Sequence, residues 1–139
     1  EQVEILHEVS LLVMNYLYRI DGEVQAHRGR GRQLGVPTLN IPLTVNIPDG
    51  VYAGVVSSGS QRFSAAVFVG AAITFGETER QVEAHLLNAD VDISGLITVE
   101  LTHWIRDNQA FTDAAALQQQ MATDLITIQQ CLQASSKNS

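Results

Sequence analysis

Short hydrophobic runs follow one another through the middle of the chain, and no helical pattern separates them. Five runs are rich in Val, Ile, Leu and Phe, and a sixth, less apolar segment precedes them. Gly, Asp, Asn, Ser and Pro residues stand between the runs, as they do in turns between strands. The six predicted strands are residues 22–26, 36–41, 51–56, 63–69, 82–87 and 97–104. Successive strands without intervening helices predict a mainly β domain, an antiparallel barrel or sandwich, rather than an alternating βαβ fold.

Two amphipathic helices are predicted to flank the strands. Residues 3–18 carry apolar side chains at helical spacing, and Asp21-Gly22 ends that pattern. The second apolar stripe consists of Leu117, Met121, Leu125, Ile128 and Leu132. Thr112 is the expected N-cap of this helix, with Asp113 in its first turn. We therefore expect an N-terminal helix within residues 1–20, a candidate linker remnant, then a barrel with its C-terminal helix over 21–134 and a frayed tail at 135–139.

Composition limits the kinds of partner. Of the 139 residues, 45% are apolar and 17% are charged, which supports a buried core and argues against disorder. The formal net charge of −7 argues against broad electrostatic binding of nucleic acid or of an anionic membrane surface. No apolar run approaches the roughly 18 residues that a membrane span needs. The single cysteine, Cys131, excludes an internal disulfide, and the acidic N-terminus is unlike a signal peptide, so we expect a cytoplasmic protein.

A segment rich in glycine and arginine carries the first chemical signal. Residues 28–40 read Arg-Gly-Arg-Gly-Arg-Gln-Leu-Gly-Val-Pro-Thr-Leu-Asn, with three arginines in five positions of an acidic chain. Glycines let the backbone approach a phosphate, and guanidinium groups can clamp its oxygens. The segment matches neither a P-loop, which needs Gly-Lys-Ser/Thr, nor the Rossmann glycine pattern. From these residues alone, a phosphate site and a solvated basic turn both remain open.

Two strand faces carry the other candidate side chains. Period two places Thr38 and Asn40 on one face of their strand, where hydroxyl and amide oxygens would suit Mg²⁺. The same period places Glu83 and His85 together, and a carboxylate in such a position can act as a general base. In both cases an ordinary solvent-facing strand explains the pattern as well, and His85 by itself is more typical of a structural histidine. The four histidines show no zinc-ligand spacing.

A series of motifs resembles the riboflavin kinase family, and in particular the kinase domain in the C-terminal half of bacterial bifunctional FAD synthetases. The resemblance covers about residues 16–130. It begins with Gly-Glu-Val at 22–24 and the signature Gly-Arg-Gln-Leu-Gly-Val-Pro-Thr-Leu-Asn at 31–40. Gly-Val-Tyr-Ala-Gly at 50–54, Thr-Phe-Gly at 74–76 and Val-Glu-Ala-His at 82–85 follow. The series ends with an Arg-Asp-x-x-x-Phe turn at 106–111 and a Leu-x-x-Gln-Met-x-x-Asp helix at 117–124.

The resemblance implies a six-stranded antiparallel Greek-key barrel with the C-terminal helix packed against it. It also implies transfer of the γ-phosphate of ATP to the 5′-hydroxyl of riboflavin, with Mg²⁺, to give FMN and ADP. Glu83 is then the catalytic base, Thr38 and Asn40 lie at the metal, and Arg106 and Phe111 are the expected flavin contacts. The implied nucleotide- and phosphate-binding residues are Gly29, Gly31, Arg32, Gly35, Thr38 and Asn40. A bifunctional enzyme would carry an adenylyltransferase domain upstream in a longer chain.

Departures from the family pattern keep a second function open. His27 stands where the family usually has Gly, and Ala72-Ile73 replaces Asn-Pro. Asn88 and Ser94 stand where Asp and Tyr are common. Only Gly adopts positive φ without strain, so His27 would crowd a phosphate loop. The alternative is a degenerate barrel that binds flavin or nucleotide without catalysis, whereas retention of the chemical residues favours an active kinase.

Overall fold

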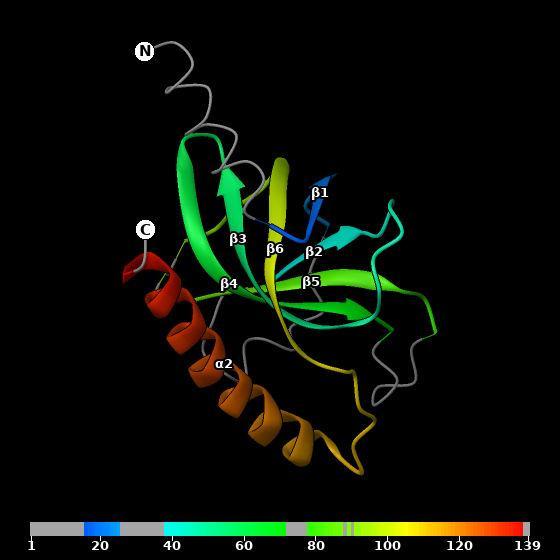
Figure 1. The fold of residues 1–139 in the computed structure, drawn as a ribbon. Helices are drawn as coiled ribbons and strands as arrows, with labels where there is room; N and C mark the ends of the chain where they lie inside the picture. Colours follow the sequence, from blue (N-terminus) through cyan, green and yellow to red (C-terminus); the bar gives the residue numbers. More distant parts are fainter. Residues whose placement is uncertain (1–15, 26–37, 72–77, 88, 90, 138–139) are drawn as a thin grey trace.

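Six strands and one long helix make up the part of the chain that the computed structural model describes (Figure 1). The described residues are 16–25, 38–71, 78–87, 89 and 91–137, with side chains to residue 133. The strands are β1 (Tyr18–Glu23), β2 (Thr38–Pro42), β3 (Gly50–Ser58), β4 (Gln61–Gly70), β5 (Gln81–Leu86) and β6 (Leu96–Arg106). The helix, α2, spans Ala114–Lys137.

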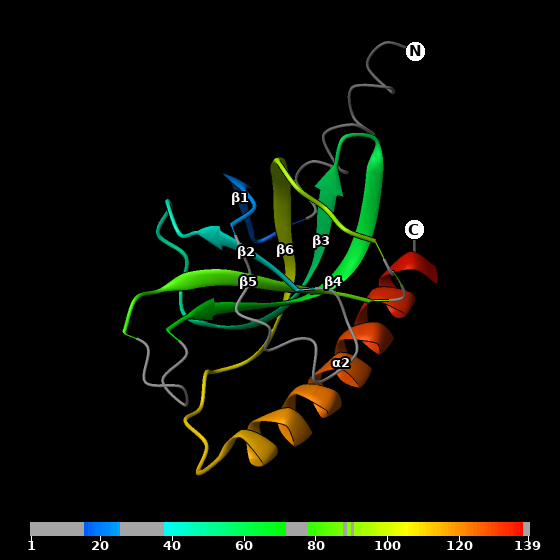
Figure 2. The ribbon, with the colours of Figure 1, turned by 180° about the vertical axis from the view of Figure 1, so that it is seen from behind.

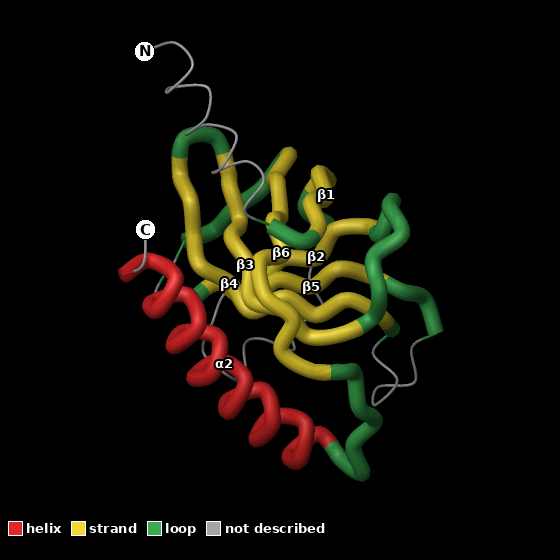
Figure 3. The backbone as a smooth tube through the Cα atoms, in the orientation of Figure 1, coloured by secondary structure: helices red, strands yellow, loops and turns green. Residues whose placement is uncertain are grey.

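The strands form one antiparallel sheet in the order β1-β6-β3-β4-β5-β2. The sheet curls into a half-barrel (Figures 1 and 3). β3, β4 and β5 are neighbours in sequence and in space, and β6 returns to lie beside β3, which is the strand order of a Greek key. At the two edges the chain after β1 meets β2, because the backbone N–H of Gln25 donates to the carbonyl oxygen of Asn40 at 2.8 Å. The predicted mainly β, antiparallel fold is confirmed.

Alternating side chains of the strands fill the inside of the half-barrel. Inward positions include Leu39 and Ile41 of β2 and Val82 and Ala84 of β5, each no more than 5% exposed. Burying a Val, Leu or Ile side chain fully contributes about 1.5–3 kcal/mol. A register slip of one residue would turn all of these side chains outward, so the core strongly specifies the pairing. As a result, the opposite faces of β2 and β5 are fixed as well.

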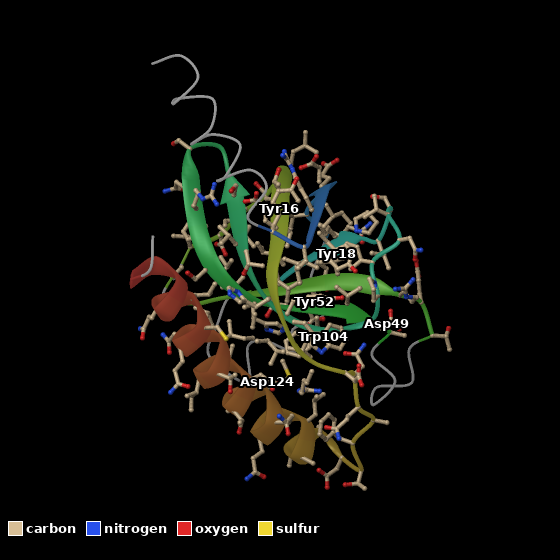
Figure 4. The ribbon with its side chains drawn as sticks, viewed as in Figure 1. Tyr16, Tyr18, Asp49, Tyr52, Trp104 and Asp124 are labelled. Carbon is tan, nitrogen blue, oxygen red and sulfur yellow. The ribbon has the colours of Figure 1, made fainter. Side chains whose placement is uncertain are left out.

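Three neighbouring aromatic side chains, Tyr18, Tyr52 and Trp104, lead from the core to the surface, where Trp104 is 46% exposed (Figure 4). Tyr52 is fully buried, and its ring meets Tyr18 and Trp104 edge to face, with centroids 6.1 and 5.2 Å away. Its hydroxyl donates to the carbonyl oxygen of Pro48 at 2.6 Å. Burial, helped by the negative charge of Asp49, raises the pKa of Tyr52 above its ordinary value. The phenol is therefore kept in its neutral, donating form.

Helix α2 crosses the outer face of the sheet, and Figure 2 shows the same packing from behind. A second buried cluster lies between helix and sheet and consists of Ile128, Val51, Ala53, Ala66 and Leu87. The predicted apolar stripe is thus the packed face of the helix. The cap is Asp113 rather than Thr112, because Oδ1 of Asp113 accepts the N–H of Ala116 at 2.8 Å. Within the described residues, no helix has an apolar stretch long enough to cross a membrane.

The first strand begins earlier than the sequence predicted. The prediction was residues 22–26, whereas β1 spans Tyr18–Glu23 and pairs with β6 along its whole length. The side chains of Tyr18 and Ile20, two residues apart on β1, both face the core. The helical spacing predicted a helix as far as residue 18, but pairing with β6 makes this segment a strand. The rest of that predicted helix, residues 1–15, lies outside the described residues, and the boundary between residues 20 and 21 stays a prediction.

Candidate active site

Two strands at one edge of the sheet bring four polar side chains together. In the register of β2 with β5, Thr38 lies opposite His85 and Asn40 lies opposite Glu83. Directly opposed residues of an antiparallel pair share a face, with Cβ atoms about 4.5–5.5 Å apart. The sequence predicted each pair on its own strand, and the strand pairing makes them one group. We call these four residues the β2–β5 polar cluster.

The β2–β5 polar cluster is buried. The exposed fractions are 5% for Thr38, 2% for Asn40, 7% for Glu83 and 0% for His85. A solvent-facing strand, the alternative that the sequence left open for both pairs, is therefore wrong. Leaving a buried polar group without a hydrogen bond costs about 1–3 kcal/mol, so a buried group of four polar side chains calls for partners.

His85 lies between Thr38 and Glu83. Its Nδ1 is 3.3 Å from Oγ1 of Thr38, and its Nε2 is 2.9 Å from Oε1 of Glu83. The glutamate oxygen lies off the axis of the ring N–H, so the second contact is a close electrostatic one rather than a straight hydrogen bond. The ring of Phe68, from β4, meets the imidazole edge to face at 5.0 Å between centroids and 82° between planes. These contacts fix both the position and the plane of the imidazole.

The side-chain amide of Asn40 has no hydrogen bond to the rest of the cluster. Neither Oδ1 nor Nδ2 of its buried amide has a hydrogen-bond partner among the described residues. An amide in this state offers one acceptor and two donors to a bound group. The oxygen can coordinate a metal ion through a lone pair, and the N–H groups can donate to a phosphate oxygen. The metal and phosphate roles that the family resemblance implies for Asn40 stay predictions, and its unpartnered amide atoms are compatible with them.

The predicted phosphate site also includes four glycine and arginine residues of the segment before β2. Gly29, Gly31, Arg32 and Gly35 lie outside the described residues. Within the described part of the chain, no group of three or more His, Cys, Asp or Glu residues could hold a metal ion. For a cation, the β2–β5 polar cluster offers the hydroxyl oxygen of Thr38 and the amide oxygen of Asn40 beside the single carboxylate of Glu83.

The two predicted flavin contacts lie elsewhere, where β6 ends and α2 packs. Nε and Nη2 of Arg106 donate to the carboxylate of Asp124 at distances down to 2.6 Å, and Nη1 donates to the carbonyl oxygen of Asp107. The guanidinium carbon lies 6.0 Å from the centre of the Phe111 ring. Asp124 is almost fully buried, with 3% of its side chain exposed. Arg106 therefore ties β6 to α2 in this structure, and its contact with flavin stays a prediction.

Two residues of these sites were not assigned a role from the sequence. His85 was read as structural, because a single histidine gives no sign of which strand it will face. Asp124 had a detectable signal, since it follows Met121 by three residues and precedes Ile128 by four, which puts a charge on the apolar stripe of the helix. A carboxylate in such a position needs a buried cationic partner, but only the fold shows that the partner is Arg106.

Comparison with known proteins agrees with this arrangement. Residues 14–132 match the family model for riboflavin kinase. The chain is 33% identical over 119 residues to the bifunctional riboflavin kinase/FMN adenylyltransferase of Escherichia coli (strain K12), a match that covers 83% of this chain and 38% of the relative. The chain spans less than half the length of the curated relatives it matches.

Two solved structures resemble the fold. One, described as a macrolide-efflux protein from Streptococcus pneumoniae, has a TM-score of 0.69 and 29% identity, and the match covers 88% of this chain and 41% of that one. The other, a riboflavin kinase from Trypanosoma brucei, has a TM-score of 0.55 and 20% identity over 83% of this chain and 79% of that one. The efflux activity belongs to the description of the first protein alone.

The curled antiparallel sheet, the helix across it and the buried face with hydroxyl, amide and carboxylate groups define a small β domain with one polar site at the edge of its sheet. The family model for riboflavin kinase matches most of the chain and therefore identifies the family. The chain belongs to the riboflavin kinase family.

Proposed function

We propose that this chain transfers the γ-phosphate of ATP to the 5′-hydroxyl of riboflavin, giving FMN and ADP. Membership of the family supports the reaction. The single observation that carries it is the β2–β5 polar cluster, because the residues assigned to metal, phosphate and base share one buried face. Phosphoryl transfer asks mainly for positioning, for neutralisation of charge and for a base near the attacking hydroxyl.

We assign Thr38 and Asn40 to the metal, and we take the metal to be Mg²⁺. Riboflavin kinases use ATP and a divalent metal, and Mg²⁺ is among the cations that hard oxygen ligands suit. The unpartnered amide of Asn40 supports this assignment, since a bound cation would satisfy its oxygen. When bound, Mg²⁺ neutralises charge on the phosphates. On the resemblance alone, the proposed phosphate-binding residues in the preceding segment are Gly29, Gly31, Arg32 and Gly35.

Glu83 is the proposed general base. Its carboxylate would accept the proton of the riboflavin 5′-hydroxyl as that oxygen attacks the γ-phosphate. It lies opposite Asn40 in the ladder, so the base and a residue of the phosphate side are neighbours across two strands. Both strands are held from the other side by core residues, which keeps the distance between the two groups fixed.

Arg106 and Phe111 are the proposed contacts to the flavin. Because the chain spans less than half of its bifunctional relatives, we also propose that it works beside an adenylyltransferase domain in a longer protein. Its single cysteine allows no internal disulfide and is compatible with the reducing cytoplasm, where we place the reaction.

A second candidate is a degenerate barrel that binds flavin or nucleotide without turnover. The departures in the sequence motivate it, and three of them, at residues 27, 72–73 and 88, lie outside the described residues. The fourth, Ser94, is exposed in the turn before β6. Retention of the whole β2–β5 polar cluster in a buried state favours the active kinase.

The test is FMN formation from riboflavin, ATP and Mg²⁺, with Glu83→Gln as the decisive variant. A positioned general base contributes about 10²–10⁴ in rate, so Glu83→Gln should lose that much FMN formation while it still binds ADP with Mg²⁺. Glu79→Gln, at an exposed position just before β5, is the matched control and should match the parent. A Glu83→Gln variant as fast as the parent refutes the base assignment, and a parent that binds flavin but makes no FMN supports the degenerate barrel.

A further inference from the structure

We propose that His85 is a positioning residue that orients two functional groups at once: the hydroxyl of Thr38 toward the metal and the carboxylate of Glu83 toward the substrate. The inference rests on the function proposed above and deepens it. It starts from the position of the imidazole, whose two nitrogens face one group each, Nδ1 at 3.3 Å from Thr38 and Nε2 at 2.9 Å from Glu83.

The chemistry of the two neighbours determines which nitrogen carries the proton. Oε1 of Glu83 is 2.9 Å from Nε2, and a lone pair on that nitrogen would repel the lone pairs of an ionised carboxylate. The contact therefore favours a proton on Nε2 electrostatically, without a straight hydrogen bond. In the neutral imidazole, a proton on Nε2 leaves a lone pair on Nδ1. That lone pair faces the Thr38 hydroxyl, which must then be the donor. The contact at Nδ1 therefore has one direction, from Oγ1–H of Thr38 to His85.

This direction matters for a metal ligand. A hydroxyl has one proton and two lone pairs, and only the lone pairs can face a cation. With the proton of Thr38 committed to His85, both lone pairs of Oγ1 point away from the imidazole. Without that acceptor the hydroxyl would rotate freely, and its proton would compete with a cation for the same space.

The imidazole is fixed in place, so it can keep the Thr38 hydroxyl and the Glu83 carboxylate in their orientations. It has no exposed surface, and Phe68 packs edge to face against it from β4. β5 lies between β4 and β2 in the sheet, so the backbone of His85 is fixed on both sides. Groups that orient ligands from behind in this way typically change metal affinity or activity by about 10–100-fold when they are replaced.

Amide substitutions separate the two contacts. Asn carries its amide near the place of Nδ1, and Gln carries its amide near the place of Nε2. His85→Asn should keep the parent affinity for ADP with Mg²⁺ and lose on the order of 10–100-fold in kcat. His85→Gln should keep most of kcat and lose nucleotide affinity by a similar factor. His85→Leu should lose both, and His103→Asn, a half-buried histidine of β6, is the matched control that should change neither.

A role in stability alone would not divide kcat from nucleotide affinity in this way. If the Asn and Gln variants change both quantities by the same factor, or change neither, the inference is wrong. If the parent makes no FMN, the proposed function fails. The role of His85 is then tested by the affinities for ADP with Mg²⁺ alone, which should be unchanged in His85→Asn and reduced in His85→Gln and His85→Leu. If His85→Leu does not fold, the two amide variants carry the test.

Two further measurements need neither activity nor a folded leucine variant. Nitrogen-15 spectra of the nucleotide-free protein should show the proton of His85 on Nε2, and a proton on Nδ1 would refute the direction of the hydrogen bond. In a Thr38→Val background, His85→Gln should cause no additional loss of nucleotide affinity. A full additional loss would mean that the two side chains act independently.

Discussion

The ion pair between β6 and α2 supports a quantitative prediction about stability. Asp124 accepts from Nε and Nη2 of Arg106 at 2.9 and 2.6 Å and from Nε2 of Gln120 at 3.1 Å. Only 3% of its side chain and 18% of the arginine side chain are exposed. Removal of one partner of such a buried pair leaves the other charge without compensation. This typically costs about 3–5 kcal/mol, against a total stability of about 5–15 kcal/mol for a domain.

Asp124→Ala should therefore lower the free energy of unfolding by about 3–5 kcal/mol. Urea unfolding followed by the fluorescence of Trp104, the single tryptophan, measures the loss directly. Asp107→Ala is the matched control, because its side chain is exposed and its carbonyl oxygen still accepts from Arg106. The control should change stability by no more than about 0.5 kcal/mol.

The double variant Arg106→Met/Asp124→Leu distinguishes the ion pair from simple loss of packing. Replacing both charges by apolar groups of similar volume is often close to neutral, so the double variant should be more stable than Asp124→Ala. If Asp124→Ala costs less than about 1 kcal/mol, or if the double variant loses as much stability as the single variants Arg106→Met and Asp124→Leu added together, the ion pair does not hold α2 on the sheet.

Two other predictions follow from the core. Leu39→Ala should cost about 2–5 kcal/mol because Leu39 is 5% exposed, whereas Leu96→Ala, at 76% exposed, should cost almost nothing; equal losses in urea unfolding would show that the strand faces are assigned wrongly. The raised pKa of Tyr52 means that its share of stability is complete below its ordinary pKa of 10.0 and is lost as pH rises through the higher folded value. Tyr52→Phe should therefore lose less stability than the parent between pH 9 and pH 11, and identical slopes would contradict the argument.

The strands and their faces were predictable because the relevant signal is local. Leu39 and Ile41 alternate with Thr38 and Asn40, and one face of the strand is buried in the core as that period predicts. The start of β1 was not predictable in the same way, since residues near Tyr18 satisfy helical and strand spacing alike. Contact with β6 decides between them.

The burial of the β2–β5 polar cluster depends on the whole fold and could not be predicted from the sequence. Period two predicts that Glu83 and His85 share a face, but it does not say whether that face meets water. The ladder between β2 and β5 and the ring of Phe68 determine the answer. Because Thr38 is buried and in contact with His85, Thr38→Ala should cost about 1–3 kcal/mol of stability.

The position of β2 at the edge of the sheet has a consequence for ligand binding. Half of the β2–β5 polar cluster sits on a five-residue strand that pairs with β5 alone along its length and meets the chain after β1 through one bridge. Edge strands open at a lower free energy than the centre of a sheet. Release of β2 would remove Thr38 and Asn40 while Glu83 and His85 stay in place on β5. A ligand that contacts both strands would therefore stabilise the pairing of β2 with β5. Amide hydrogen exchange in β2 would slow as the ligand binds.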